Sequence, residues 1–411
     1  MARLAALVLG FTLLARAAAA ADSCVDCHRD LPEPLGTPLE GMTSDVHAKA
    51  GLSCAGCHGG DPGDADLTAM DAHKGFVGKP TRERIPDFCG RCHADENTIR
   101  RFNPQLPTDQ LAEYRTSVHG RRLADGDAKV ATCISCHGVH GILPASDARS
   151  PVFASNVART CARCHADATY MAAYQIPTDQ FAKYQRSVHG ELLLRERDLS
   201  APTCNNCHGN HGAYPPGADS VAAVCGQCHA INKDLFLASP HRAAFSRLGL
   251  PECVTCHSNH EIHRTSDEML GVGPTAVCVT CHANESAGYA AAGRMRAAVD
   301  QLHDTIVSAE RALVSASTAG MEVSEAEFGL QSAREGLVQA RNQVHAFNPA
   351  ALEKTAGTAT EIAAGAERTG QAALAELHNR RWMALIPLGL IVLVGALVWW
   401  RMRALDKGDA T

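Results

Sequence analysis

The longest uninterrupted apolar stretch of the chain is residues 382–400, WMALIPLGLIVLVGALVWW, which holds no charged residue. As a helix this stretch is about 28 Å long, close to the ~30 Å thickness of a hydrocarbon core. Trp382 stands at one edge and Trp399 and Trp400 stand at the other, where indole rings settle at membrane interfaces. We therefore predict one transmembrane helix over 382–400 and a cytoplasmic tail over 401–411.

A helical pattern fills residues 284–381, where Cys is absent and Ala, Glu, Gln and Arg are frequent. Apolar residues recur there at intervals of three and four, as at Leu302, Ile306, Ala309 and Leu313. This region is therefore predicted to be all α-helical and separate from the preceding chain.

Breaks in this pattern predict two helices and a third segment. Gly320 interrupts the first helix, Ser324 and Glu327 have the spacing of a capping box, and Asn348-Pro349 ends the second helix. We predict an antiparallel α-helical hairpin. Residues 359–377, rich in Ala and Gly, are predicted to form a helical spacer that leads to the bilayer.

Residues 1–21 have the pattern of a secretory signal peptide. Arg3 is basic, Leu4–Ala15 is apolar, and the following alanines offer a cleavage site near Ala20. The apolar part is too short to cross a membrane, and Arg16 interrupts it. Together with the C-terminal helix, this predicts an inner-membrane protein with a single anchor and its bulk in the periplasm.

An internal repeat is visible between these ends. Residues 106–120 (LPTDQLAEYRTSVHG) and 176–190 (IPTDQFAKYQRSVHG) are identical at ten of fifteen positions. Each copy predicts one short helix that begins at Asp109 or Asp179 and ends at the glycine. His119 and His189 would then project from a helix end, which is a suitable place for a metal ligand.

Composition changes the picture through Cys and His. The chain of 411 residues holds 18 Cys and 21 His, while only 5% is aromatic, so a conventional core would be thinly supplied. Every Cys belongs to a C-x-x-C-H motif. The motifs are Cys24/Cys27/His28, Cys54/Cys57/His58, Cys89/Cys92/His93, Cys133/Cys136/His137, Cys161/Cys164/His165, Cys204/Cys207/His208, Cys225/Cys228/His229, Cys253/Cys256/His257 and Cys278/Cys281/His282.

This spacing predicts nine covalently attached c-type haems over residues 22–283. Two thiols three positions apart can each form a thioether to one haem vinyl group, and the adjacent His then becomes the proximal ligand of the iron. Zinc sites would give no reason for a His after every second Cys. Disulfides within C-x-x-C would close loops too small to stabilise much.

Twelve further histidines are available as distal ligands. Eight of them recur at fixed places in four two-haem units, here called repeats 1–4. These eight are His47 and His73, His119 and His140, His189 and His211, and His241 and His260. The leading motif at His28 makes the ninth haem, whose sixth ligand is left open among His263, His303, His345, His378, a Met, or no ligand.

Spacing limits the assignments. His140, His211 and His260 each lie three residues beyond a proximal His, too close to reach the far face of the same porphyrin, so each is expected to bind a neighbouring haem. His303 and His345 would supply distal ligands if the hairpin folds back on the haem domain. The alternative for the hairpin is a coiled-coil stalk or a contact in a homo-oligomer.

The nine motifs, with SVHG and CHGxHG at several of the further histidines, resemble the multihaem cytochrome c superfamily of cytochrome c3-like and quinol-linked respiratory cytochromes. The resemblance covers Cys24 to His282. It implies bis-His haems, a mainly α fold with much irregular loop, and electron transfer in anaerobic respiration. Two features depart from relatives: quinol dehydrogenases of this superfamily usually have an N-terminal anchor, and the C-x-x-C-K motif of nitrite reductases is absent here.

The expected function is an electron carrier that links a quinol-oxidising membrane complex, for example a b-type cytochrome, to periplasmic cytochromes or a terminal reductase. The alternative is a reductase of nitrite, hydroxylamine or sulfur oxyanions with one open haem. The formal charge of −6 and the lack of a basic stripe argue against nucleic acid as a partner.

Overall fold

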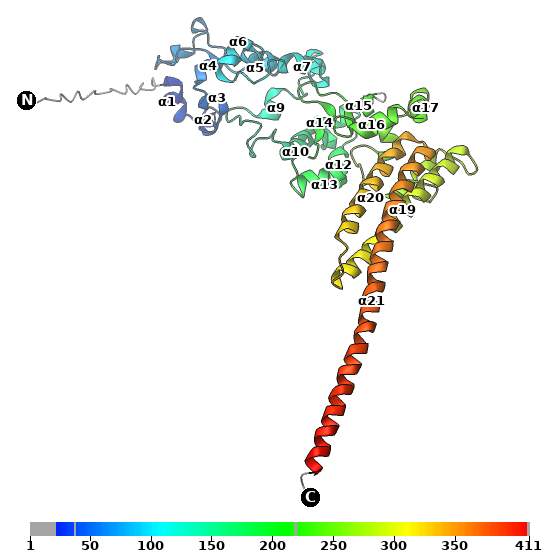
Figure 1. Ribbon diagram of the computed structural model, residues 1–411. Helices are drawn as coiled ribbons and strands as arrows, with labels where there is room; N and C mark the ends of the chain where they lie inside the picture. The colour runs from blue at the N-terminus through cyan, green and yellow to red at the C-terminus, as the bar shows by residue number, and fades with distance from the viewer. Residues whose placement is uncertain (1–21, 37, 218–219, 409–411) are drawn as a thin grey trace, which may run out of the picture. The chain divides into compact units, whose positions relative to one another are not determined.

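The computed structural model describes residues 22–36, 38–217 and 220–408, with side chains as far as Arg403. The predicted signal peptide lies outside the described residues. Helices joined by irregular loops make up these segments, and no β-strand occurs in them, which confirms the predicted fold class (Figure 1). The chain divides into two compact units. Unit 1 runs to Pro215 and includes His260–Ile262, while unit 2 comprises Pro216–Asn259 and the residues from His263 onward.

Unit 1 contains short helices only. They are α1 (Ser23–Arg29), α2 (Pro38–Met42), α3 (Val46–Lys49), α4 (Cys54–His58), α5 (Ile85–His93), α6 (Glu96–Phe102), α7 (Gln110–Thr116), α8 (Val118–Ala124), α9 (Cys133–His137), α10 (Ala154–His165), α11 (Ala168–Met171), α12 (Gln180–Arg186), α13 (Val188–Leu194) and α14 (Cys204–His208). Its 3-10 turns are η1 (Leu67–Met70), η2 (Ala72–Lys74), η3 (Arg82–Arg84) and η4 (Ala172–Tyr174).

Unit 2 begins with short helices and continues with long ones. They are α15 (Val221–Cys225), α16 (Ala230–Leu237), α17 (Pro240–Leu248), α18 (Glu252–His257), α19 (Ala287–Thr318), α20 (Ser324–Gln343) and α21 (Pro349–Gly408). Its 3-10 turns are η6 (Asp267–Met269), η7 (Val277–Thr280) and η8 (Val344–Ala346).

The repeated segment forms two helices per copy, where the sequence predicted one. Ser117 ends α7 and caps α8 by accepting a hydrogen bond from the Gly120 backbone N–H at 2.9 Å, and Ser187 does the same between α12 and α13. The glycines therefore lie inside the second helix and not at its exit. A Cβ on Gly120 would stand 1.9 Å from the Tyr114 carbonyl oxygen, so only glycine permits this close approach.

The haem-motif segments have small apolar cores. One cluster in unit 1 joins Ala158, Tyr184, Leu193 and Ala201, and one in unit 2 joins Ala222, Phe236 and Phe245. Clusters of this size bury far less apolar surface than a domain of this length usually needs. The sequence expectation of a thinly supplied core agrees with this arrangement.

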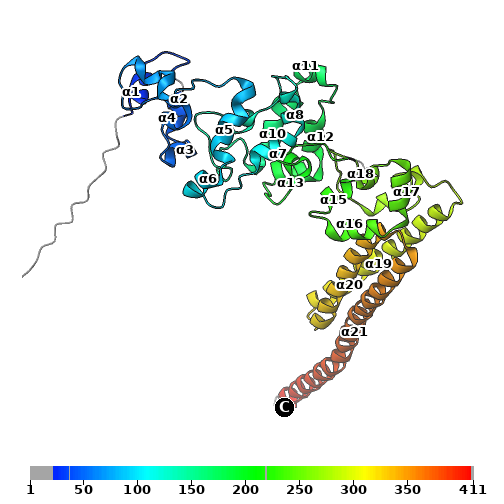
Figure 2. The ribbon, with the colours of Figure 1, turned by 90° about the horizontal axis from the view of Figure 1, so that it is seen from above.

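The long helices of unit 2 form a three-helix bundle with a continuous core. The predicted hairpin is present as α19 and α20, and the first half of α21 packs along both (Figure 1 and Figure 2). Leu302, Leu313, Leu330 and Leu352 are at most 2% exposed in this core. The residues predicted as a spacer thus form the third helix, through small side chains such as Ala363 that let the helices approach closely.

The start of α20 is predicted correctly at Ser324, but its predicted capping box does not form. The N-cap residue is Val323, which has no side-chain cap, and the Ser324 backbone N–H donates instead to the Glu322 carboxylate at 3.0 Å. A carboxylate two residues upstream thus satisfies an N–H group at the helix start that has no partner within the helix.

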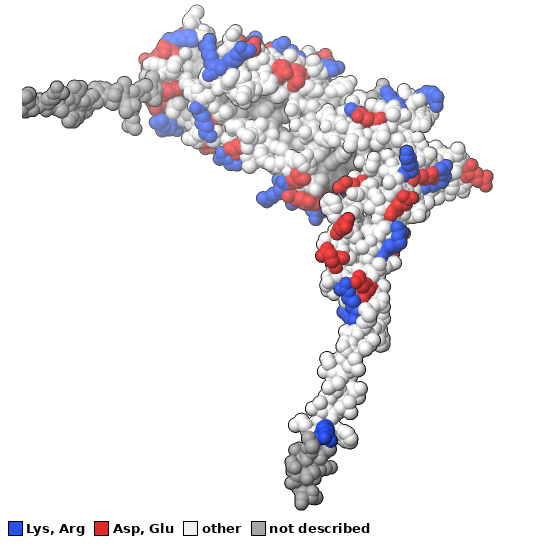
Figure 3. Space-filling view, in the orientation of Figure 1, with Lys and Arg blue, Asp and Glu red and all other residues white. Residues whose placement is uncertain are grey.

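Beyond the bundle, α21 continues alone. It is the one helix among the described residues that is long and apolar enough to cross a membrane, and none of its most apolar window is buried. Figure 3 shows charged side chains spread over the bundle and an uncharged surface along the following part of α21, up to a basic group near the end. This fits the predicted single C-terminal anchor.

The bundle core provides a matched test. Leu313→Ala should lower the free energy of unfolding of the bundle by about 2–5 kcal/mol, because Leu313 is 1% exposed and its removal leaves a cavity. The neighbouring Val314 is 60% exposed, so Val314→Ala should change it by roughly 0.5 kcal/mol or less. Urea titration of the full chain in detergent, followed by helical circular dichroism, measures both, and equal losses would contradict the packing described.

Candidate haem-binding sites

Each C-x-x-C-H motif forms a helical turn. Helices α4, α9 and α14 begin at the first Cys of a motif and end at its His, while α5 and α10 end at a motif His. Residues three apart lie on the same side of a helix, so the two thiols of a motif face one way. None of the 18 Cys forms a disulfide, which leaves their thiols available for thioether bonds.

Thiols of consecutive motifs lie beside one another along each unit. In unit 1, Cys24 is close to Cys54, Cys57 to Cys92, Cys89 to Cys133, Cys136 to Cys164, and Cys161 to Cys204. In unit 2, Cys225 is close to Cys253, and Cys256 to Cys278 and Cys281. The six motifs of unit 1 and the three of unit 2 therefore each form an unbroken row in sequence order.

The two thiols of a motif differ in exposure, although the sequence analysis gave both the same role. The first Cys of every motif is partly buried. The second Cys is partly buried in four motifs but exposed in the other five, at Cys27, Cys92, Cys207, Cys228 and Cys281. The helical turns are short and the apolar clusters beside them are small, so a neighbouring motif often covers only one of the two thiols.

This difference changes the picture of the sites at the five exposed thiols, Cys27, Cys92, Cys207, Cys228 and Cys281. The motif spacing makes them equivalent to the first Cys of their motifs, whereas the structure places them at the surface. A thioether at these positions would hold a haem by an edge that is open to solvent. Haem attachment at all 18 thiols stays a prediction from the motif spacing.

Seven motif histidines of the described chain face the ring of a second histidine. The pairs and the distances between ring centres are His93 and His47 (5.9 Å), His58 and His140 (6.1 Å), His165 and His119 (6.1 Å), His137 and His211 (6.2 Å), His208 and His260 (5.9 Å), His282 and His241 (5.9 Å), and His257 and His345 (6.0 Å).

This separation fits a six-coordinate iron between the two rings. A metal–imidazole bond is about 2 Å long and the ring centre lies roughly 1 Å further, so an ion held by two imidazoles separates their centres by roughly 6 Å. Direct stacking would bring rings closer than this. Two thiols that can form thioethers, beside a pair of imidazoles, make a donor set that suits a haem c with two His ligands.

The repeat that supplies the facing ring depends on whether the motif is the first or the second of its own repeat. In repeats 1, 2 and 4 the second motif takes its facing ring from the same repeat, as His93 does from His47. The first motif takes the ring from the next repeat, as His58 does from His140. The predicted binding of His140, His211 and His260 to neighbouring haems agrees with this geometry.

Backbone hydrogen bonds join the two facing segments in three repeats. The residue before His47, His119 or His189 donates its N–H to a carbonyl oxygen. That carbonyl belongs to the residue two positions after His140, His211 or His260. These bonds are Val46 to Ile142 (2.8 Å), Val118 to Ala213 (3.1 Å) and Val188 to Ile262 (2.8 Å). The distal ligands of the two haems in a repeat are thereby fixed relative to each other.

Hydrogen bonds also set the tautomer of several motif histidines. Nδ1 of His58 lies 2.9 Å from the Gly78 carbonyl oxygen, and Nδ1 of His28 lies 2.9 Å from that of Leu35. A carbonyl oxygen can only accept, so Nδ1 carries the proton and Nε2 is left able to bind a metal.

Burial keeps the facing imidazoles neutral. Desolvation lowers the pKa of His93, His119, His137, His165 and His257 below the ordinary value, and also that of His345. The neutral imidazole is the form that binds a metal. Desolvation therefore favours coordination at these sites.

Asp45 is a supporting residue that the sequence analysis did not single out. It is 4% exposed, and Oδ1 accepts from the His47 backbone N–H at 2.7 Å and lies 3.2 Å from Nδ1 of the same residue. Oδ2 accepts from the N–H groups of Gly141 at 2.6 Å and Ile142 at 2.8 Å. Burial raises the pKa of Asp45, but these backbone donors bring it below its usual value.

One carboxylate thus holds the segments of two distal histidines, His47 and His140. In repeats 2 and 3 the same place is taken by Ser117 and Ser187, which cap one helix and donate to a carbonyl of the helix before it. Aligning D-V-H at residues 45–47 with S-V-H in the later copies would have pointed to this residue.

The bundle supplies the facing ring for the eighth motif. His345 lies in η8, its Nδ1 is 3.0 Å from the Asn342 carbonyl oxygen, and its ring faces His257. Phe347 packs on the His241 ring with centres 3.7 Å apart. Arg341 on α20 binds the Asp267 carboxylate at 2.6 and 2.9 Å, which fixes this end of the bundle to the haem-motif segment of unit 2.

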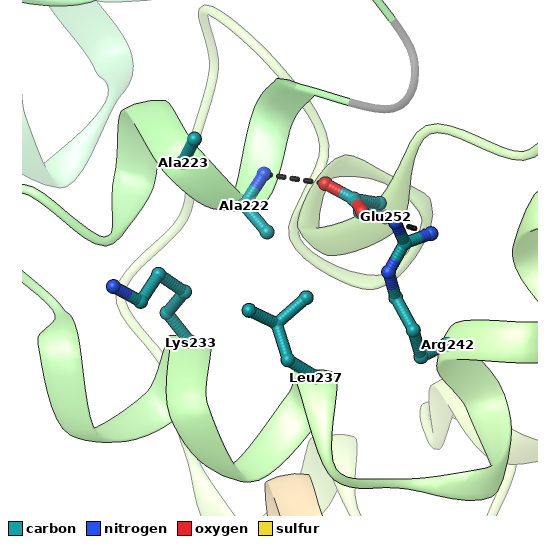
Figure 4. Close-up of a pocket in the computed structure, with 6 residues that line it drawn as sticks. All are labelled: Ala222, Ala223, Lys233, Leu237, Arg242 and Glu252. Carbon is teal, nitrogen blue, oxygen red and sulfur yellow. Dashed lines mark hydrogen bonds and ion pairs between the residues drawn. The ribbon is translucent and has the colours of Figure 1, made fainter.

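A cavity of about 370 Å³ in unit 2 lies between α15, α16, α17 and α18 (Figure 4). Glu252 on its wall is 3% exposed, accepts from the Ala222 N–H at 2.6 Å and lies 3.6 Å from Arg242. Because α15 carries Cys225 and Cys253 follows Glu252, this buried carboxylate joins the seventh and eighth motifs.

Three of the other predicted ligands, His28, His73 and His303, are placed differently. His73 in η2 and His303 on α19 are exposed, and in the described chain neither faces a motif histidine. His28 likewise has no imidazole opposite it within the described residues. His189 lies in the first turn of α13 in unit 1, while His229 follows α15 in unit 2.

Asp45 gives a testable prediction. Asp45→Ala should lower the free energy of unfolding of the haem-loaded chain by about 2–4 kcal/mol, because it leaves buried N–H groups without an acceptor. The control is Asp71→Ala, since exposed Asp71 accepts only from the His73 N–H at 2.8 Å, and its loss should cost about 1 kcal/mol or less. Denaturant titration followed by the Soret band measures both, and similar losses would contradict the role of Asp45.

Comparison with known proteins finds one family model that matches part of the chain. No solved structure matches the chain. Residues 46–166 match the family model described as cytochrome c3, and this segment spans the second to fifth motifs. The cytochrome c3 family carries covalently bound haem c, which agrees with the available thiols and facing imidazoles there. The match supports assignment of this chain to the multihaem c-type cytochrome superfamily.

Proposed function

We propose that this chain is a membrane-anchored nonahaem cytochrome of the periplasm that transfers electrons in anaerobic respiration. It would connect a quinol-oxidising complex of the inner membrane with periplasmic redox proteins or a terminal reductase. When bound, haem c supplies a one-electron redox centre. The chain's Cys residues would hold each such centre through thioether bonds, and at seven motifs a pair of imidazoles would close both axial positions.

The observation that carries this proposal is the unbroken row of motifs in each unit. Thiols of neighbouring motifs are close enough to interact at every step within a unit, as between Cys89 and Cys133. Groups attached to such thiols would lie edge to edge. Electron tunnelling weakens exponentially with distance, so short, serial steps are what a conducting protein needs.

The facing imidazoles support a carrier over an enzyme. At seven motifs of the described chain a second His stands where a substrate would have to bind. The reductase alternative has its candidate position at His28, for which the described residues offer no facing imidazole.

Electron paramagnetic resonance of the oxidised, haem-loaded chain tests the choice, with a pyridine haemochrome assay to count haems. A carrier predicts nine haems that are low-spin at the paired motifs and reduce reversibly. A high-spin signal that changes on addition of nitrite, hydroxylamine or sulfite would instead favour the reductase. A count well below nine would contradict the haem assignment.

Two histidines of the bundle region give a matched prediction. His345→Ala should convert one haem per chain from low spin to high spin, because the ring facing His257 is lost. His303→Ala should leave the spectrum unchanged, since His303 is exposed. The haem count should remain the same in both variants, because the thioether bonds are untouched. An unchanged low-spin spectrum in His345→Ala would contradict the assignment of this ligand.

A further inference from the structure

The three haem motifs of unit 2 and the bundle meet at one end of the bundle. The ninth motif leads directly into α19, and His282 lies so close to that helix that a Cβ on Gly288 would stand 2.0 Å from its Nδ1. His345 follows the end of α20, and Pro349 begins α21 two residues after Phe347. His282, His345 and Phe347, through which the haem motifs contact the bundle, therefore all lie near the starts of α19 and α21.

The transmembrane segment leaves the bundle at the opposite end. Helices α19 and α21 run in the same direction, because Arg294 binds Glu353 near their starts and Gly370 packs on Ala312 further along both. Helix α20 packs against both and runs in the opposite direction. The turn between α19 and α20 thus lies at the end from which α21 continues toward Trp382, as Figure 1 shows.

The length of the separation follows from helix geometry. From Pro349 to Trp382 α21 is one continuous helix, and a rise of 1.5 Å per residue makes this stretch about 50 Å long. A common transmembrane tilt of ~20° would shorten the height only slightly. The proline within α21, Pro387, lies inside the apolar segment and does not interrupt this stretch.

Between Pro349 and Trp382, helix α21 packs against α19 and α20 along most of its length. Its buried side chains continue from Leu352 to Ala366, with Ala373 and Leu374 packed against the same core. Only residues 375–381 separate the last of these contacts from Trp382, and Arg380 pairs with Glu376 one turn earlier on the same helix. A helix packed in this way against two others does not fold back toward the membrane.

We propose that the bundle is a spacer that holds the haems of unit 2 about 50 Å away from the membrane surface. Electrons would then enter or leave unit 2 through a protein whose own redox centre also lies outside the membrane, and not from quinol in the bilayer. The proposal rests on the electron-transfer function proposed above. Its basis is that tunnelling across such a gap is negligibly slow.

A haem at the ninth motif would be accessible to a partner at this distance from the membrane. Cys281 is exposed, and so are the following residues Ala283, Asn284 and Glu285. A haem joined to this thiol would have one edge open to a protein partner. This edge stands beside the start of α19, at the end of the bundle remote from the membrane.

Neutron reflectometry on the full, haem-loaded chain in a supported bilayer tests the spacing. Because unit 2 stands on its bundle, the protein layer should extend at least about 50 Å from the lipid headgroups. A layer that ends well short of about 50 Å would overturn the proposal. This readout does not depend on electron transfer.

Reduction by quinol tests the consequence. Each naphthoquinol oxidised to the quinone releases two electrons and two protons and can reduce two ferric haems. With the chain in nanodiscs, a quinol with a long isoprenoid tail should reduce the unit 2 haem at His257, followed through the spectral change that His345→Ala causes, no faster when it shares the chain's disc than when it is in separate discs. Menadiol, which has no tail and dissolves in water, should reduce this haem directly.

Faster reduction in shared discs would overturn the spacer proposal and leave electron transfer intact. Failure of a strong soluble reductant to reduce the haems reversibly would instead contradict the proposed function. The two results are distinguishable because the second uses no membrane component.

Discussion

The arrangement of this chain depends on one geometric feature, seven pairs of imidazole rings whose centres lie roughly 6 Å apart, a separation that suits an iron between them. The rings of a pair come from distant parts of the sequence, such as His58 and His140 or His257 and His345. Each pair therefore closes a long loop, which is costly in entropy unless the bonds formed compensate. Where apolar clusters are as small as those of the haem-motif segments, these closures replace much of a conventional core.

Much of the local structure positions the histidines of these pairs. The break between α7 and α8, with Ser117 as cap and Gly120 in contact with the Tyr114 carbonyl, directs His119 from the first turn of a helix. Asp45 does the same for His47 and also binds the loop of His140. Because a buried carboxylate is stable only with several donors, Asp45 forces both segments into one arrangement, whereas serine positions one segment only.

The sequence was sufficient where spacing alone decides the geometry. C-x-x-C-H fixes a helical turn, and a His three residues beyond the motif cannot reach round its own porphyrin, so cross-binding by His211 and His260 was predictable. The identity of the partner was not, because it depends on contacts such as Val188 to Ile262 between segments far apart in sequence. The same holds for the exposure of Cys207, since the spacing within a motif does not say which of its thiols a neighbour covers.

The exposure of His303 could have been predicted from the helical pattern around it. Leu302 and Ile306 are buried, so the residue after Leu302 is turned about 100° away from the core. A His at that position points away from the other two helices of the bundle. The helical pattern that predicted the hairpin was therefore also sufficient to separate His303 from His345, which lies beyond the end of α20.

The residues predicted as a helical spacer were not predicted to pack as the third helix of the bundle, because the core side of that helix is mostly alanine. Ala356, Ala359, Ala363 and Ala366 recur at helical intervals and are all nearly buried, but alanine gives little contrast between the two sides of a helix. The rule that a first motif takes its ring from the next repeat explains the place of His345. After repeat 4 no further repeat follows in this sequence, and His345 stands where the next copy would have supplied a facing ring. The bundle therefore supplies the ring that faces His257 from η8, the turn that joins α20 to α21.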